Sequence, residues 1–138
     1  MNIGFDAKRL FLNYTGLGNY SRFIVESLVR TFPENNYRLF TPKIKSTADT
    51  SFFLNQIQIR IHTPPVAMPL KSLWRSAGTN LIKPVRDLDI YHGLSAELPL
   101  FLPKKVKKVV TVHDLIFIRY PQYYSAANRA IYKAKLRY

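Results

Sequence analysis

The chain has 138 residues, which is enough for one domain with a hydrophobic core and too few for two domains of ordinary size. Its formal net charge is +13, from 21 Lys and Arg against 8 Asp and Glu, so we expect an anionic partner. It contains no cysteine, which excludes disulfides and thiolate metal sites and favours a reducing compartment.

The sequence also predicts where the protein resides. It begins with strand-like residues and lacks a basic segment followed by an apolar run, which argues against a secretory signal. It has no run of about 18 apolar residues, so we do not expect it to span a membrane. These features predict a cytoplasmic protein.

The first part of the chain predicts two strands and a helix. Residues 2–6 have strand-like sequence, and a ten-residue loop, 7–16, is expected to follow. A helix of about four turns is then predicted by an apolar stripe at spacings of three and four. The stripe consists of Tyr20, Phe23, Ile24, Leu28 and Phe32. Pro33 ends the helix, residues 37–41 form the second predicted strand, and residues 43–56 match no element.

The middle of the chain predicts two further strands. Residues 57–62 alternate strictly between isoleucine and polar residues, as in a half-exposed strand near a sheet edge. Residues 70–83 suit a helix weakened at Gly78. Residues 90–92 predict a short strand, and an apolar loop with two prolines, 93–103, follows it.

The last part of the chain carries the strongest strand signal. Residues 109–112 are four β-branched residues in a row, which predict a central strand buried on both faces of a parallel sheet. Ser125 is expected to cap a last helix that runs from Ala126 to Tyr138 without a stop signal, as if the chain were cut in mid-element. The alternation of elements predicts a doubly wound, Rossmann-like α/β domain with a parallel sheet.

Two stretches follow strands in the way that ligand-binding loops do. Ligands of open α/β sheets bind outside the carboxyl ends of the strands. His113 and Asp114 follow one predicted strand, and Gly16 and Gly18 lie between another strand and a helix. Backbone N–H groups at this helix start can point toward a phosphate. The alternative is a loop that needs positive φ and a glycine helix cap.

Four motifs taken together resemble a known family. They are DAKRL at 6–10, TGLGNY at 15–20, DIYHG at 89–93 and VTVHDL at 110–115. In order and spacing they resemble the amino-terminal domain of family 4 retaining glycosyltransferases, particularly the mannosyltransferase-like members that build bacterial surface polysaccharides. The resemblance covers nearly the whole chain.

The resemblance implies a GT-B architecture, in which two Rossmann-like domains face each other across a cleft. Residues 1–138 would be the acceptor-side domain, and the donor domain, which mainly holds the sugar nucleotide, is absent from this sequence. We therefore expect this chain to be inactive by itself. The implied reaction is transfer of a hexose, with retention, to a glycan or a lipid-linked acceptor.

The resemblance also implies roles for single residues. Backbone groups at Gly16 and Gly18 would approach the donor diphosphate. His113 would contact the transferred sugar, where it hydrogen-bonds a hydroxyl and stabilises the charge that develops as the glycosidic bond breaks. The structural alternative is a histidine bonded to backbone, with Asp114 capping the next turn. Because neighbouring strand residues point to opposite faces, His113 and Asp114 are not expected to form an acid/base pair.

Other candidate residues flank these positions. Arg9, Asn19 and Tyr20 lie beside the glycines and are candidates for the cleft wall. His92 ends a predicted strand and is expected at the cleft floor, whereas His62 is expected to be solvated.

We expect neither a metal nor a cofactor, since the sugar nucleotide is a substrate. Asp87 and Asp89 look like an Asp-x-Asp metal site, but they precede a strand instead of following one. The resemblance is also to a fold that does not use this motif. The three histidines have no ligand spacing that would unite them.

The basic residues leave two interpretations open. Lysines at 104, 105, 107 and 108, and the basic last helix, could form a solvated face or meet an anionic membrane surface. The apolar loop 98–103 lies next to these lysines and favours the membrane, which would place the protein at its inner face.

The rival function is a non-enzymatic nucleic-acid-binding module, because the charge and the interleaved aromatic residues suit one. The sequence has no helix-turn-helix, ribonucleoprotein motif or zinc finger, and most aromatic residues fall on predicted core faces. We therefore favour the glycosyltransferase over nucleic-acid binding.

Overall fold

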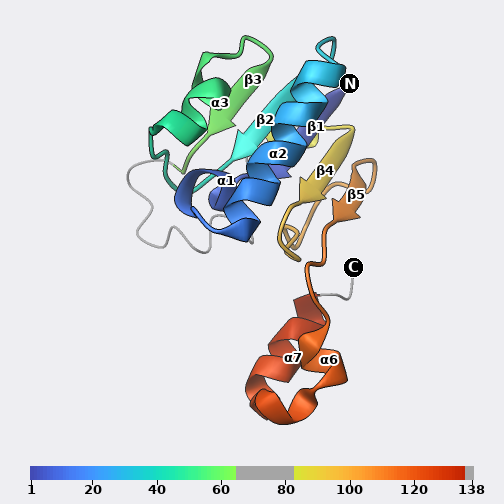
Figure 1. The fold of residues 1–138 in the computed structure, drawn as a ribbon. Helices are drawn as coiled ribbons and strands as arrows, with labels where there is room; N and C mark the ends of the chain where they lie inside the picture. The colour runs from blue at the N-terminus through green and yellow to red at the C-terminus, as the bar shows by residue number, and fades with distance from the viewer. Residues whose placement is uncertain (65–82, 136–138) are drawn as a thin grey trace.

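The computed structural model describes residues 1–64 and 83–135. Within these ranges the chain forms a parallel sheet of five strands, in the spatial order β3-β2-β1-β4-β5. The strands are β1 (Asn2–Asp6), β2 (Asn36–Phe40), β3 (Ile59–His62), β4 (Ile90–Gly93) and β5 (Lys107–Val110). The predicted Rossmann-like α/β fold is therefore confirmed (Figure 1).

The order of the strands determines where a ligand would bind. The chain runs from β1 outward to β2 and β3, and it then crosses to the other side of β1 for β4 and β5. Strands β1 and β4 are neighbours, with Ile3 paired to Ile90. Where strand order reverses in this way, a crevice forms outside the carboxyl ends of the two strands. This edge of the sheet lies next to Asp6 and Gly93.

Helices cover both faces of the sheet. The α-helices are α1 (Lys8–Leu12), α2 (Gly16–Thr31), α3 (Ser51–Asn55), α5 (Lys83–Arg86), α6 (Ile116–Arg119) and α7 (Ala126–Lys135). Two 3₁₀ turns, η1 (Ala48–Thr50) and η3 (Pro121–Tyr123), complete the elements of the described residues. Helix α2 lies along the near face of the sheet in Figure 1, whereas α6 and α7 stand apart from the sheet beyond β5.

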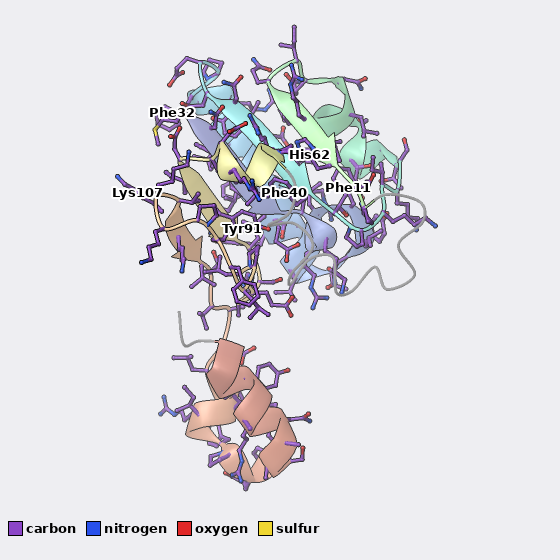
Figure 2. All side chains as sticks on the ribbon, turned by 180° about the vertical axis from the view of Figure 1, so that it is seen from behind. Phe11, Phe32, Phe40, His62, Tyr91 and Lys107 are labelled. Carbon is purple, nitrogen blue, oxygen red and sulfur yellow. The ribbon has the colours of Figure 1, made fainter. Side chains whose placement is uncertain are left out.

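Side chains that alternate along the strands form two cores. In β2, Leu39 packs into the core under α2, and Phe40 packs into the core on the opposite face. Figure 2, seen from behind, shows this second face with Phe40, Tyr91 and His62. The ring of Phe40 stacks on Tyr91 at 5.8 Å and on His62 at 5.1 Å. Because both faces are covered, the inner strands have largely apolar sequences.

Helix α2 forms as predicted, but the predicted buried stripe is partly wrong. Val25 and Val29 are buried, whereas Phe23 is 67% exposed and Phe32 is also exposed. The apolar residues of α2 span a wide arc of the helix, and the periodicity does not show which line within this arc meets the sheet. In the structure, the side of the helix that contains Val25 and Val29 faces the sheet.

The region predicted as the loop 7–16 contains helix α1, which corrects that expectation. A helix of five residues is too short to show a periodic pattern. It is stabilised by complete burial of Leu10 and Phe11 and by the Asp6 carboxylate, which accepts a hydrogen bond from the Lys8 N–H at 3.1 Å. The unassigned segment 43–56 likewise contains η1 and α3, where Phe53 is buried.

Strand β5 differs most from its prediction. It spans Lys107–Val110, two residues earlier than predicted, and it is an edge strand of the described sheet instead of a central one. Lys107, Lys108 and Val109 are exposed, so the strand is not buried on both faces. A run of β-branched residues indicates a strand but does not distinguish a central position from an edge.

Strand β3 confirms the predicted edge position at the other side of the sheet, although it begins at Ile59 and leaves Ile57 93% exposed. His62 at its end is not solvated as expected. Its ring packs on Phe40, and its buried Nε2 has no hydrogen-bond partner in the described part of the chain. The predicted helix 70–83 lies outside the described residues, except for Lys83 at the start of α5.

The last helix begins where the sequence indicated. Ser125 Oγ accepts a hydrogen bond from the Asn128 N–H at 3.2 Å, which confirms the predicted cap. Helix α7 packs against α6 through stacked rings of Phe117 and Tyr132, whose centroids are 5.0 Å apart. Across residues 1–64 and 83–135, no helix combines the length and the apolar character that crossing a bilayer requires.

Candidate functional site

A cavity of about 170 Å³ opens at the carboxyl edge of the sheet, next to the segments that follow β4 and β5. It is lined by Arg9, Leu17, Ser95, Ala96, Val112, His113, Asp114, Phe117 and Tyr132. These residues come from α1, the first turn of α2, two post-strand segments, and helices α6 and α7. The cavity therefore lies at the edge where open parallel sheets bind ligands.

Arg9 supplies the cationic group of this cavity. It lies on α1, whose position is determined by the buried Leu10 and Phe11 beside it. No hydrogen bond or ion pair of the Arg9 guanidinium is found among the described residues. A guanidinium has five N–H donors in a fork that fits a carboxylate or a phosphate. Arg9 is thus available to an anion.

His113 lines the cavity and is also bonded to backbone. Its Nε2 lies 2.8 Å from the carbonyl oxygen of Leu94, and its ring is edge-on to Tyr20 at 4.9 Å. A carbonyl oxygen can only accept, so Nε2 carries the proton. In neutral His113 the other nitrogen, Nδ1, is then a hydrogen-bond acceptor, and in the imidazolium it is a donor. The predicted structural and ligand roles of His113 are therefore compatible.

Asp114 lies beside His113 in the cavity wall. Its Oδ1 accepts a hydrogen bond from the Ile116 N–H at 3.2 Å and so caps the turn that leads into α6. This is the structural role that the sequence indicated. His113 and Asp114 each bond to a different backbone group. The expectation that they point to opposite faces of a strand does not apply, because β5 ends at Val110 and both residues line the cavity.

The first turn of α2 is organised by Asn13, which the sequence analysis missed. Asn13 Oδ1 accepts hydrogen bonds from the Thr15 N–H at 3.0 Å, the Thr15 hydroxyl at 2.8 Å and the Gly18 N–H at 3.0 Å. Asn13 thus caps the helix in place of Thr15, whose own side chain makes no cap bond. The Gly18 N–H, predicted to approach a phosphate, already has an acceptor.

The two glycines of this turn differ in their surroundings. A Cβ at Gly18 would lie 1.7 Å from the Asn13 carbonyl oxygen, whereas nothing lies within 4 Å of a Cβ at Gly16. No described glycine has positive φ, so the alternative interpretation of a loop that needs positive φ is wrong, and close packing explains Gly18. No acceptor within the described chain bonds the N–H groups of Gly16 and Leu17. Leu17 lines the cavity, so an anion there would meet this end of α2.

Tyr20 and His92 are joined through Thr111. The Tyr20 hydroxyl lies 3.0 Å from Thr111 Oγ1, and Thr111 Oγ1 lies 2.8 Å from His92 Nε2. Burial lowers the pKa of His92 below its ordinary value, so the imidazole is neutral near pH 7. This chain of contacts connects α2 with the ends of β4 and β5 and supports His113, which packs on Tyr20. Tyr20 and His92 do not themselves line the cavity.

Asn19 points toward a buried arginine instead of the cavity. Its Oδ1 accepts a hydrogen bond from Arg22 Nη2 at 2.6 Å. Arg22 Nη1 donates to the carbonyl oxygens of Leu10 and Asn13 at 2.9 and 3.0 Å. Arg22 therefore binds α1 and the turn after it to α2, a structural role that the charge pattern did not reveal.

The acidic pair before β4 is used in the fold. Asp89 Oδ2 accepts a hydrogen bond from the Asn2 N–H at 2.7 Å, and the Asp87 carbonyl accepts one from the Asn2 side chain at 3.1 Å. These contacts lie at the amino end of β1, opposite the cavity. Within the described ranges, no three His, Cys, Asp or Glu side chains gather as metal ligands would.

Several cavity residues had no predicted role. Ser95 and Ala96 fall in a segment that the sequence indicated only as an apolar loop, and Ala96 has a φ of 54°, which is costly for any residue with a Cβ. Phe117 and Tyr132 are brought to the cavity by helices that follow β5. A polar residue soon after a strand, as at Ser95, is the signal that could have been used.

Comparison of the chain with family models, with curated proteins and with solved structures finds no match. We therefore infer the function from the residues of the cavity and from the motifs that contain them.

Proposed function

We propose that the chain is the acceptor-side domain of a retaining GT-B glycosyltransferase that transfers a hexose, mannose-like, from a sugar nucleotide to a glycan or a lipid-linked acceptor. The proposal is based on one observation about the cavity. Arg9, the start of α2 at Leu17, and the pair His113 and Asp114 come from three of the four glycosyltransferase-like motifs, and they line one cavity. The fourth motif provides His92, which supports this wall through Thr111.

The chemistry of these groups suits a sugar diphosphate. Transfer breaks the bond between the sugar C1 and a phosphate oxygen, forms a bond from C1 to an acceptor hydroxyl oxygen, and releases the hydroxyl proton. Negative charge then accumulates on the departing diphosphate. The Arg9 guanidinium and the N–H groups of Gly16 and Leu17 are placed at one edge of the sheet and would stabilise that charge without a metal.

His113 and Asp114 would bind the sugar. With Nε2 bonded to Leu94, His113 can accept a hydrogen bond from a sugar hydroxyl at Nδ1, or donate one when it is protonated. The Asp114 oxygen that does not cap Ile116 can accept from a second hydroxyl. In this proposal the separate donor domain faces the cavity and holds most of the nucleotide.

A transfer assay tests the proposal. The protein that includes this chain and its donor domain is supplied with labelled sugar nucleotides, GDP-mannose among them, and with candidate acceptors. We expect transfer, and a loss of about a hundredfold in kcat/KM for His113→Ala, which removes a hydrogen bond to the reacting sugar. The matched control is His62→Gln, at the far edge of the sheet, which should keep full activity.

The proposal fails if no donor in the panel is consumed, or if His113→Ala and His62→Gln have equal activity. Tight binding of random oligonucleotides that collapses steeply with added salt would favour the nucleic-acid-binding alternative instead.

A further inference from the structure

We propose that the turn between β4 and β5, together with the first two residues of β5, is a docking surface for an anionic lipid bilayer. The surface consists of Leu100, Phe101, Lys104, Lys105, Lys107 and Lys108, and we call it the lysine turn. It is separate from the cavity, because none of these residues lines it. The inference does not depend on the glycosyltransferase proposal.

The two apolar residues of the lysine turn are held outward by the fold. Leu100 is 67% exposed and Phe101 is 73% exposed, at the tip of a turn. The residues on either side, Leu98 and Leu102, are buried in the core behind the sheet and fix the turn in place. A leucine and a phenylalanine at such a tip are unfavourable in water and suit insertion into the boundary between head groups and acyl chains.

The lysines supply the charge that matches an anionic surface. All four are exposed, and no acidic residue occurs from Leu98 to His113. The ion pair found among the described residues joins Glu26 to Arg30 and involves none of these lysines. Lys107 lies at the outer margin of the sheet in Figure 2, on the edge strand β5. The lysines can therefore approach anionic head groups without losing an internal partner.

Protection of the sheet edge explains only part of this arrangement. Lysines on an edge strand discourage pairing with other strands, which accounts for Lys107 and Lys108 on β5. It does not account for Lys104 and Lys105 in the turn, nor for two exposed apolar residues beside them. A surface that binds an oligonucleotide presents several aromatic rings along a groove, on which successive bases stack. Of the two exposed apolar residues in the lysine turn, only Phe101 is aromatic.

Vesicle co-sedimentation of the full 138-residue chain tests the proposal. Vesicles made of equal parts phosphatidylglycerol and phosphatidylcholine are compared with vesicles of phosphatidylcholine. We expect binding to the anionic vesicles and little binding to the neutral ones. The double change Lys104→Gln with Lys105→Gln should weaken binding about 25-fold, at about fivefold for each lysine near the surface. Phe101→Ser should weaken it by about tenfold.

Matched controls lie elsewhere on the molecule. Lys43→Gln with Arg60→Gln removes the same charge from exposed residues of the opposite half of the sheet. Phe23→Ser removes an equally exposed phenylalanine from α2. Both should bind vesicles like the original chain. Because every substituted residue is exposed, all variants should keep the circular dichroism of the folded chain.

Three results would overturn the proposal. Equal binding to neutral and anionic vesicles would remove the role of charge. Equal losses in the lysine-turn variants and their controls would show attraction by net charge without a defined surface. Displacement of the chain from vesicles by a short random oligonucleotide, with tighter binding to the oligonucleotide, would assign the surface to nucleic acid.

Discussion

Gly18 approaches Asn13 so closely that a Cβ at position 18 would lie 1.7 Å from the Asn13 carbonyl oxygen. The same residue pair is joined by the hydrogen bond from the Gly18 N–H to Asn13 Oδ1 at 3.0 Å. This contact closes the turn between α1 and α2, and it therefore holds Arg9 and Leu17 at the cavity.

Gly18→Ala should destabilise the protein by about 3 kcal/mol, because the obstructing atom is backbone and cannot rotate away. Gly16→Ala is the matched change, and it should alter stability by less than about 0.5 kcal/mol because a Cβ there meets nothing. Urea unfolding measures both. Equal stabilities of the two variants would contradict the described turn.

Two arginines near this turn should behave in opposite ways. Arg22→Gln should cost about 3 kcal/mol of stability, since it breaks three hydrogen bonds of a buried guanidinium. Arg9→Gln should cost less than about 0.5 kcal/mol, because no hydrogen bond or ion pair of its side chain occurs within the described ranges. Thermal unfolding separates the two variants. A strongly destabilised Arg9→Gln would show that Arg9 supports the fold instead of serving a ligand.

Ala96 has a φ of 54°, where a side chain is strained and glycine is not. Ala96→Gly should therefore stabilise the chain by about 1 kcal/mol, read as a higher urea midpoint with an unchanged slope. Ala127→Gly, in helix α7, provides the opposite control and should destabilise that helix. If Ala96→Gly is less stable than the original chain, the backbone at Ala96 is not strained as described.

His62 and His92 should make stability depend on pH. Burial lowers the pKa of both below the ordinary value of 6.5, and for His62 the charges of Arg38 and Arg60 lower it further. The unfolded chain then binds protons that the folded chain does not, so stability is complete above pH 6.5 and falls as the pH falls below it. His62→Gln and His92→Gln should each flatten this fall between pH 7 and pH 5.5, measured by urea unfolding across the range. If neither change reduces the dependence of stability on pH, burial does not lower the pKa of these two histidines as described.

The sequence predicted the strands better than the contacts between them. Runs such as 2–6 and 90–92 are apolar and short, and they are strands in the structure. Periodicity is a local property, so it did not reveal the five-residue helix α1 or the edge position of β5. The link from Tyr20 to Thr111 spans 91 positions and follows from the fold, not from any local pattern. For the same reason the motifs identified Arg9 and His113, whereas Ser95 and Tyr132 became visible as cavity residues only in the structure.

The most direct test of the proposed function is to titrate the protein that includes this chain and the proposed donor domain with GDP-mannose, and to follow the backbone amide signals of this chain by nuclear magnetic resonance. We predict that the displaced signals belong to Leu17, Ser95 and His113 around the cavity, and that Arg9→Gln reduces the displacement at a given ligand concentration. Uniform or absent displacement at these residues, or displacement confined to the lysine turn, would contradict a sugar-nucleotide site in this cavity.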